Sequence, residues 1–202
     1  MGQYYKPICL SEDYKQKPEN CIVAAISSYD YDNGAKLTEH SYVGNDFVLA
    51  ALNMLNQHNG SRFVWCGDYQ EDFEPKLLDE DGDEMSLYSM ADDFAKKTEN
   101  MPTPIDLGIT YIVNLDKKEY YKIPPYCSQK YTYHPLPLLC AAGNGLGGGD
   151  YHGKNTKEVG RWAFDHIEVL TEKPIGAKYK GFKSITNIKF RDLRFDEEEE
   201  DE

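Results

Sequence analysis

The sequence predicts a single α+β domain with a mostly antiparallel sheet and about two helices. Segments with alternating apolar and polar residues outnumber segments with helical spacing, and short turn signals separate most of them. The chain has 16 tyrosines against 8 phenylalanines, which favours a sheet with half-buried rings and hydrated hydroxyl groups. We expect one domain over residues 1–195, with an acidic and partly helical excursion at 70–104, and a disordered acidic tail at 196–202.

The strands expected in the first part of the chain are set by apolar runs and turn residues. Alternation with aromatic residues predicts an opening strand at 3–10, and a bounded apolar run predicts a second strand at 21–29. The pair Asn33-Gly34 favours positive φ, so we expect a hairpin that leads into a strand at 35–42. Another strand is expected at 62–69.

Two segments have the spacing of amphipathic helices. Asn45 is a suitable N-cap, and the apolar residues that follow recur at helical spacing over 47–57. Ser86 is a suitable N-cap for a second, shorter helix over 86–97.

The second half of the chain again favours strands. A hairpin is expected between 109–115 and 119–123. Two prolines at alternate positions in 134–140 predict an extended or edge segment there rather than a helix. Strands are also expected at 161–170 and, more weakly, at 182–190.

The charge of the chain excludes one class of partner. Its formal net charge is −13, with 22 basic and 35 acidic residues, and nucleic acid binding needs clustered Lys and Arg. The run of seven acids from Asp196 to Glu202 repels itself and predicts disorder. Its functional alternative is an acidic arm that mimics nucleic acid or docks on a basic partner.

Cysteine usage and hydropathy place the protein in a reducing compartment. Five cysteines without a Cys-x-x-Cys pair argue against a disulfide framework or a zinc site, and favour reduced thiols in a cytoplasm. No apolar leader or long apolar span indicates secretion or membrane insertion. Asp79, Asp81 and Asp83 alternate as in a calcium loop, but the required glycine and glutamate positions are not matched, so we expect no metal and no cofactor.

A glycine-dense loop follows the apolar run that ends at Ala142. Six of the 16 glycines lie in residues 143–153, and consecutive glycines can direct several main-chain N–H groups at one phosphate or carboxylate. Lys154 and Arg161 would add positive charge, and Trp65 or Tyr151 would stack on a base. The remaining predicted ligand-binding residues are Gly143, Asn144, Gly145, Gly147, Gly148 and Gly149. The alternative is a wide turn that only joins two strands.

A second hypothesis is catalytic. An imidazole oriented by a carboxylate can act as a general base in a hydrolase or transferase. The candidate side chains are His40, His134, His152, Glu39, Asp68 and Asp150. Half-buried histidines bonded to the backbone are the alternative reading of the same residues.

Several motifs are similar to those of a known family. They are Met1–Pro7, Asn33–Ser41, Trp65–Tyr69 and the stretch from His134 to Tyr151. Through them the chain resembles a family of bacterial and bacteriophage-associated proteins that carries no established activity. The resemblance implies the cytoplasm of a bacterium or of a phage-infected cell.

Three functions follow as expectations. The first is binding of a phosphorylated or nucleotide-like small molecule at the glycine loop, for which the resemblance implies a phage- or defence-related sequestering role. The second is the hydrolase or transferase. The third is an acidic module that binds a basic protein partner. None of them involves nucleic acid or a membrane, and the sequence leaves the oligomeric state open.

Overall fold

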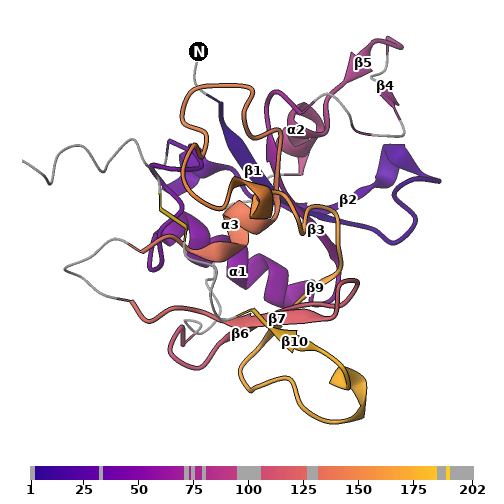
Figure 1. Ribbon diagram of the computed structural model, residues 1–202. Helices are drawn as coiled ribbons and strands as arrows, with labels where there is room; N and C mark the ends of the chain where they lie inside the picture. The colour runs from indigo at the N-terminus through magenta and orange to yellow at the C-terminus, as the bar shows by residue number, and fades with distance from the viewer. Residues whose placement is uncertain are drawn as a thin grey trace, which may run out of the picture.

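The computed structural model describes residues 3–31, 34–70, 73, 76–78, 81–94, 106–126, 132–185 and 190–191. Within these residues the chain forms two mixed four-stranded sheets, a two-stranded sheet and three α-helices (Figure 1). The α+β class and the mostly antiparallel pairing are therefore confirmed. The acidic tail expected at 196–202 lies outside the described residues.

The first four-stranded sheet has the order β2-β1-β3-β8. Its strands are β1 (Tyr5–Leu10), β2 (Ile22–Ala25), β3 (Arg62–Gly67) and β8 (Ala141–Ala142). Strand β1 pairs antiparallel with β2 and β3, whereas β3 and β8 run parallel. The carboxyl ends of β3 and β8 therefore lie at the same edge of the sheet as the start of β1.

The second four-stranded sheet has the order β10-β7-β6-β9. Its strands are β6 (Tyr111–Asn114), β7 (Glu119–Lys122), β9 (Ile167–Leu170) and β10 (Lys183–Ser184). The hairpin of β6 and β7 is the one that the sequence predicts. Strand β10 pairs parallel with β7 and covers only the start of the expected strand at 182–190, of which residues 186–189 are outside the described part.

The remaining elements are one helix of 12 residues and several short ones. They are the hairpin of β4 (Leu77–Leu78) and β5 (Glu84–Met85), and the helices α1 (Asp46–Gln57), α2 (Leu87–Met90) and α3 (Pro135–Leu139). Five single turns of 3-10 helix lie at Pro18–Asn20, Ser28–Tyr31, Ala91–Asp93, Thr156–Glu158 and Ala177–Tyr179. Among the described residues, no helix has the length and apolar character needed to cross a membrane.

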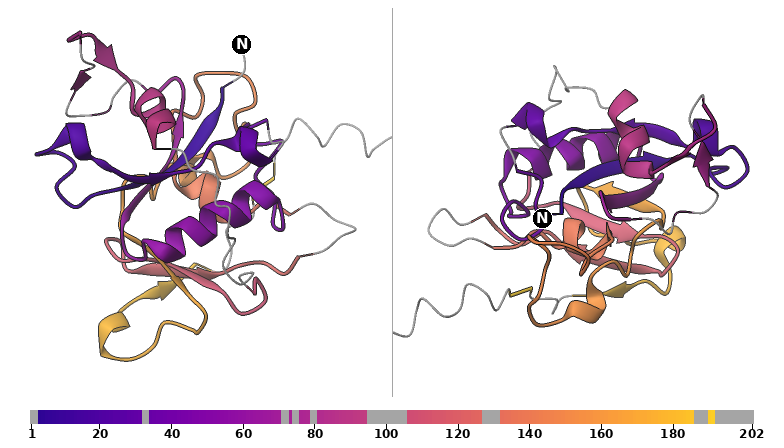
Figure 2. Two further views of the ribbon diagram at one scale, coloured as in Figure 1. Left: turned by 180° about the vertical axis from the view of Figure 1, so that it is seen from behind. Right: turned by 90° about the horizontal axis from the view of Figure 1, so that it is seen from above.

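The core has two parts because the first sheet is buried on both faces. On one face, Cys9 of β1 and Trp65 of β3 join the buried side chains of α1, α3 and the second sheet. Figure 2 shows the ribbons of these elements from two further sides. On the other face, Ile8 and Val64 pack with Leu87 of α2. Successive side chains of a strand point to opposite faces of its sheet. Because both faces of this sheet are covered, every residue of β1 is buried.

Helix α1 begins as the sequence predicts. The Asn45 side-chain oxygen accepts hydrogen bonds from the N–H groups of Phe47 and Val48, at 3.0 and 3.3 Å. These bonds satisfy two of the N–H groups that the first turn of a helix leaves without a partner. The apolar stripe of α1 is buried in the core that both large sheets share.

Helix α3 corrects the expectation of an extended segment at 134–140. Pro135 and Pro137 both lie in the first turn, where N–H groups have no partner within the helix, so their missing N–H groups cost little. His134 is the N-cap, and its ring nitrogen Nδ1 accepts the N–H of Leu136 at 3.2 Å. The prolines thus begin a helix instead of excluding one.

Three other expectations are corrected in part. The expected strand at 35–42 is replaced by turns, with Ala35 at a φ of 55°. The expected strand at 161–170 is a strand only from Ile167, because residues 161–164 form turns and Phe164 has a φ of 67°. Ser86 caps α2 by accepting the N–H of Ser89 at 3.0 Å, but α2 ends at Met90 and residues 95–97 are outside the described part.

Candidate functional site

The glycine-dense segment 143–153 begins where β8 ends and is held by the main chain on two sides. The Gln3 N–H donates to the Gly148 carbonyl at 2.6 Å. The N–H and the hydroxyl of Thr38 both donate to the Gly149 carbonyl, at 3.1 and 3.0 Å. The loop is therefore fastened to the segment before β1 and to the turns that follow Gly34.

Two of the main-chain amides expected to bind a ligand, those of Gly145 and Gly147, are bonded to a carboxylate of the chain itself. Oδ2 of Asp150 accepts the N–H groups of Gly145 and Gly147 at 2.6 and 3.0 Å. Oδ1 of Asp150 accepts the hydroxyl of Tyr5 at 2.8 Å. Burial, reinforced by the charge of Asp150, raises the pKa of Tyr5, so this hydroxyl stays a donor at neutral pH. The side chain of Asp150 is fully buried, although Gly145, which donates one of these hydrogen bonds, is exposed.

The two aromatic residues expected to stack on a ligand lie inside the protein. Trp65 is 1 % exposed, and its ring contacts the rings of Phe47 and Phe63. Tyr151 is also 1 % exposed, and its main-chain N–H donates to Asn144 Oδ1 at 2.9 Å. Neither ring presents an open face to a nucleobase in this structure, which corrects the expectation for these two residues.

The two basic residues beside the loop differ in their surroundings. Arg161 forms ion pairs with Glu119 at 2.5 Å and with Glu158 at 2.6 Å, so its charge is compensated within the protein. Lys154 is exposed, and its main chain pairs with Arg191. Lys154 is the more exposed of the two, because the Arg161 side chain is only 26 % exposed.

The three histidines of the catalytic hypothesis have different environments. His134 is fully buried as the N-cap of α3, and burial lowers its pKa to about 3. His40 is half-buried with its ring against Gly34, and burial lowers its pKa as well. His152 is exposed. His134 is therefore a neutral structural group at physiological pH.

The carboxylates of that hypothesis also bond to other groups. Glu39 forms an ion pair with Lys36 at 3.1 Å. Asp68 accepts the N–H of Tyr4 at 3.1 Å, and Asp150 accepts two N–H groups of the glycine loop. In the part of the chain that the structure describes, no group of three or more His, Cys, Asp or Glu side chains could hold a metal ion. General-base catalysis by the six residues stays a prediction.

Sequence reasoning missed a histidine that lies between two carboxylates. Nδ1 of His166 is 2.8 Å from Asp116, in the turn after β6, and Nε2 is 2.8 Å from Glu12, in the loop after β1. Burial alone would lower its pKa, but the hydrogen bonds to Glu12 and Asp116 outweigh burial and raise the pKa of His166. Glu12 is 154 residues away in sequence, so no local pattern indicates this cluster.

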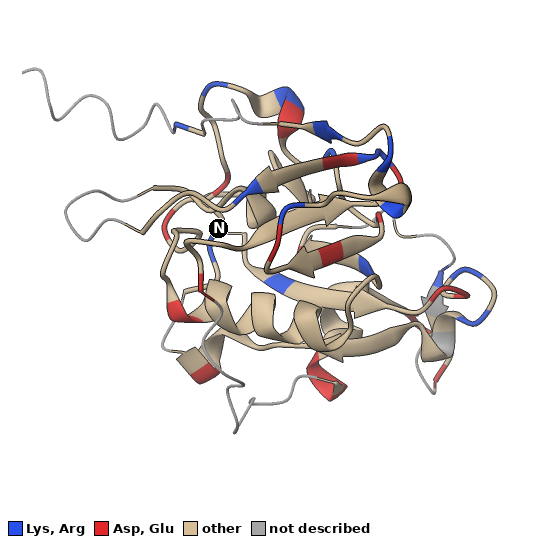
Figure 3. Cartoon of the chain, turned by 90° about the horizontal axis from the view of Figure 1, so that it is seen from below, with Lys and Arg blue, Asp and Glu red and all other residues tan. Residues whose placement is uncertain are grey.

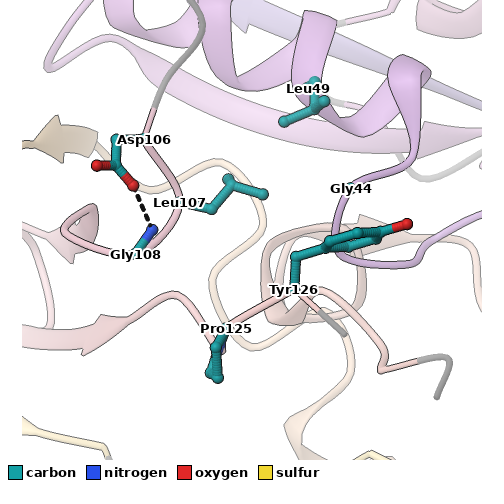
Figure 4. A pocket seen from close by; sticks show the side chains of 7 residues that line it. All are labelled: Gly44, Leu49, Asp106, Leu107, Gly108, Pro125 and Tyr126. Atoms are coloured by element: carbon teal, nitrogen blue, oxygen red, sulfur yellow. Dashed lines mark hydrogen bonds between the residues drawn. The ribbon is translucent and has the colours of Figure 1, made fainter. Parts of the chain in front are cut away.

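Sequence reasoning also missed a surface pocket with a volume of about 460 Å³ (Figure 4). The pocket lies between the first turns of α1, the turn that precedes β6 and the segment that follows β7. Its lining residues are Gly44, Leu49, Asp106, Leu107, Gly108, Pro125 and Tyr126. Tyr126 is 62 % exposed although its ring lies directly over Gly44. Because three distant segments contribute, only the folded chain assembles this pocket.

Comparison with family models, curated proteins and solved structures finds no match to this chain.

Proposed function

We propose that the protein is an acidic binding module for a partner protein that carries basic residues. The observation that carries this proposal is that the carboxylate of Asp150 accepts two N–H groups of the glycine loop. An incoming phosphate would have to displace a buried group that already makes three hydrogen bonds. The glycine loop then acts as a scaffold that ties β8 to β1.

The surface chemistry favours a basic partner. The net charge of −13 attracts positively charged surfaces and raises their rate of encounter. Charged residues lie mainly on loops and outer strands, whereas α1 carries a single charged residue, Asp46 (Figure 3). Four cysteines of the described chain, Cys9, Cys21, Cys66 and Cys140, are buried free thiols. They fit a bacterial or phage-infected cytoplasm as the setting.

A specific observation keeps the small-molecule hypothesis as the second candidate function. The side chain of Gln3 is fully buried against Gly67 and Gly143, and neither of its amide atoms has a hydrogen-bond partner in the described structure. The Gln70 side-chain oxygen, beside Gly143, is also without one. Unpaired buried polar groups are costly. A ligand with hydrogen-bond donors and acceptors, such as a nucleotide, would satisfy these atoms if the loop opened.

One experiment with the full chain separates the two candidates. Thermal unfolding is followed with ATP, GTP, NAD, ADP-ribose and inorganic phosphate, while a panel of labelled Arg- and Lys-containing peptides is titrated by fluorescence anisotropy. The proposal predicts no thermal shift with the nucleotides and peptide affinities that fall with added salt. A nucleotide present at 100 times its Kd would stabilise the fold by about 2.7 kcal/mol. A saturable shift of that size, without peptide binding, would overturn the proposal in favour of the second candidate.

A further inference from the structure

We propose that the pocket around Tyr126 and Asp106 binds an arginine side chain of the partner protein. This inference rests on the proposed function and names the surface that performs it. The guanidinium group would stack on the Tyr126 ring and pair with the Asp106 carboxylate. The methylene groups of the arginine would lie on Leu49 and Leu107.

The pocket combines an aromatic wall, an aliphatic floor and a carboxylate. In Figure 4, Tyr126 and Asp106 lie on opposite sides of the space, with Leu49 and Leu107 between them. Arginine is the basic side chain that suits this combination, because its planar and weakly hydrated guanidinium stacks on aromatic rings. Lysine is a compact and strongly hydrated charge, and it would lose more hydration here.

A second carboxylate adds to the charge complementarity. Asp46 is the first residue of α1 and is exposed. It precedes Leu49 by three residues, so both side chains lie on the same face of the helix. The positive end of the helix dipole opposes a cation. However, the N–H groups of Phe47 and Val48 at this end already donate to Asn45. The negative charge of Asp46 offsets the remaining positive potential of the helix end.

The pocket walls are preformed. Oδ1 of Asp106 accepts the N–H of Gly108 at 2.9 Å, which fixes the turn that carries Leu107. Gly44 has a φ of 86°, and a Cβ atom there would lie 2.5 Å from the Tyr126 ring. Glycine therefore permits the close approach of the ring to the main chain. An arginine would enter this space with little rearrangement of its walls.

The test titrates the full ¹⁵N-labelled chain with a short synthetic peptide of composition Gly-Ser-Arg-Trp-Ser-Gly. Matched peptides replace the arginine by lysine or by the neutral isostere citrulline. The arginine peptide should shift the amide signals of Gly44 and Gly108 and bind more tightly than both others. An exposed cation–π contact and an exposed ion pair each contribute about 0.5–1 kcal/mol, so Tyr126→Ala and Asp106→Asn should each weaken binding by about two- to fivefold.

Control variants separate the pocket from the overall charge. Tyr126→Phe keeps the ring and should retain binding, and Asn at position 106 can still accept the Gly108 N–H. Glu172→Gln removes an equal charge at an exposed position outside the pocket and should leave the affinity unchanged. If Glu172→Gln weakens binding as much as Asp106→Asn, or the lysine peptide binds as well as the arginine peptide, the pocket assignment is overturned while binding of basic partners stands. If the neutral citrulline peptide binds as well as the arginine peptide, positive charge is not recognised, and both the pocket assignment and the proposed function are overturned. If no basic peptide binds the unmodified chain, the proposed function fails with it.

Discussion

Acidification should destabilise this protein well above the pH at which its carboxylates titrate, because His134 is buried in the neutral form. Its pKa is about 3 in the folded chain against 6.5 for an unperturbed histidine. Between these values the unfolded chain binds a proton that the folded chain does not, so stability falls as pH falls through this window. The contribution is fully present above pH 6.5, and no more is lost below about pH 3.

The size of this effect follows from the two pKa values. At 1.36 kcal/mol for each pH unit, lowering the pH from about 6 to about 4.5 should remove roughly 2 kcal/mol of unfolding free energy. The variant His134→Asn removes the contribution of His134 to the pH dependence of the unfolding free energy. An asparagine can still accept the Leu136 N–H as an N-cap, but it does not titrate. The variant loses packing in the core, so its stability should be lower throughout. It should fall less steeply with falling pH in this window, where His40, whose pKa burial also lowers, still contributes.

Urea denaturation at several pH values measures the effect. Trp65 and Trp162 are both buried, so their fluorescence reports unfolding. Carboxylates with lowered pKa values, such as Asp13 and Asp116, contribute stability that is lost only as pH falls below about 4. Parallel pH profiles for the unmodified chain and His134→Asn between pH 6 and 4.5 would refute the assignment of the effect to His134.

Three further predictions concern stability. Asp150→Ala should lower the free energy of unfolding by about 3–5 kcal/mol. It removes three hydrogen bonds to a buried carboxylate, each of which contributes about 1.5–3 kcal/mol, and these contributions do not add in full. Urea denaturation measures the loss, and a loss below about 1 kcal/mol would contradict the hydrogen bonds described for Asp150. Replacing His166 by Gln should cost at most about 1 kcal/mol, since its partners Glu12 and Asp116 are partly exposed. Because the pKa of His166 is raised in the folded chain, its contribution is present below pH 6.5 and is lost as pH rises through the folded pKa, so the variant and the unmodified chain should converge in stability at alkaline pH. Asn45→Ala should cost about 1 kcal/mol through loss of the cap of α1, seen as a lower midpoint of thermal unfolding, whereas Asn45→Ser should retain most of it.

Elements with strong local signals are found where the sequence predicts them. Helix α1 has its capping residue and apolar stripe within a dozen residues, and the β6–β7 hairpin has its turn between two apolar runs. Expectations failed where a local pattern allowed two outcomes. Pro135 and Pro137 fit the first turn of a helix as well as an extended segment, and packing in the core selects the helix.

In the candidate site, too, local sequence sets some features and contacts between distant residues set the others. The glycine density at 143–153 predicts main-chain amides directed at one anionic group, and the amides of Gly145 and Gly147 do share one carboxylate oxygen. That carboxylate belongs to Asp150, and its other oxygen accepts the hydroxyl of Tyr5, which is 145 residues away. The pocket around Tyr126 likewise combines segments that have no common sequence pattern.

The sequence by itself determined the fold class, the strongest helix and the central hairpin, and it located the glycine-dense loop whose amides accept a carboxylate. These features depend on spacing, capping and backbone freedom, which act over a few residues. Only the tertiary structure decided that Asp150 supplies this carboxylate, that Trp65 is in the core, and that Tyr126 borders an open pocket. Burial and partner choice depend on contacts between residues far apart in the chain, and those contacts form only when the sheets pack around α1.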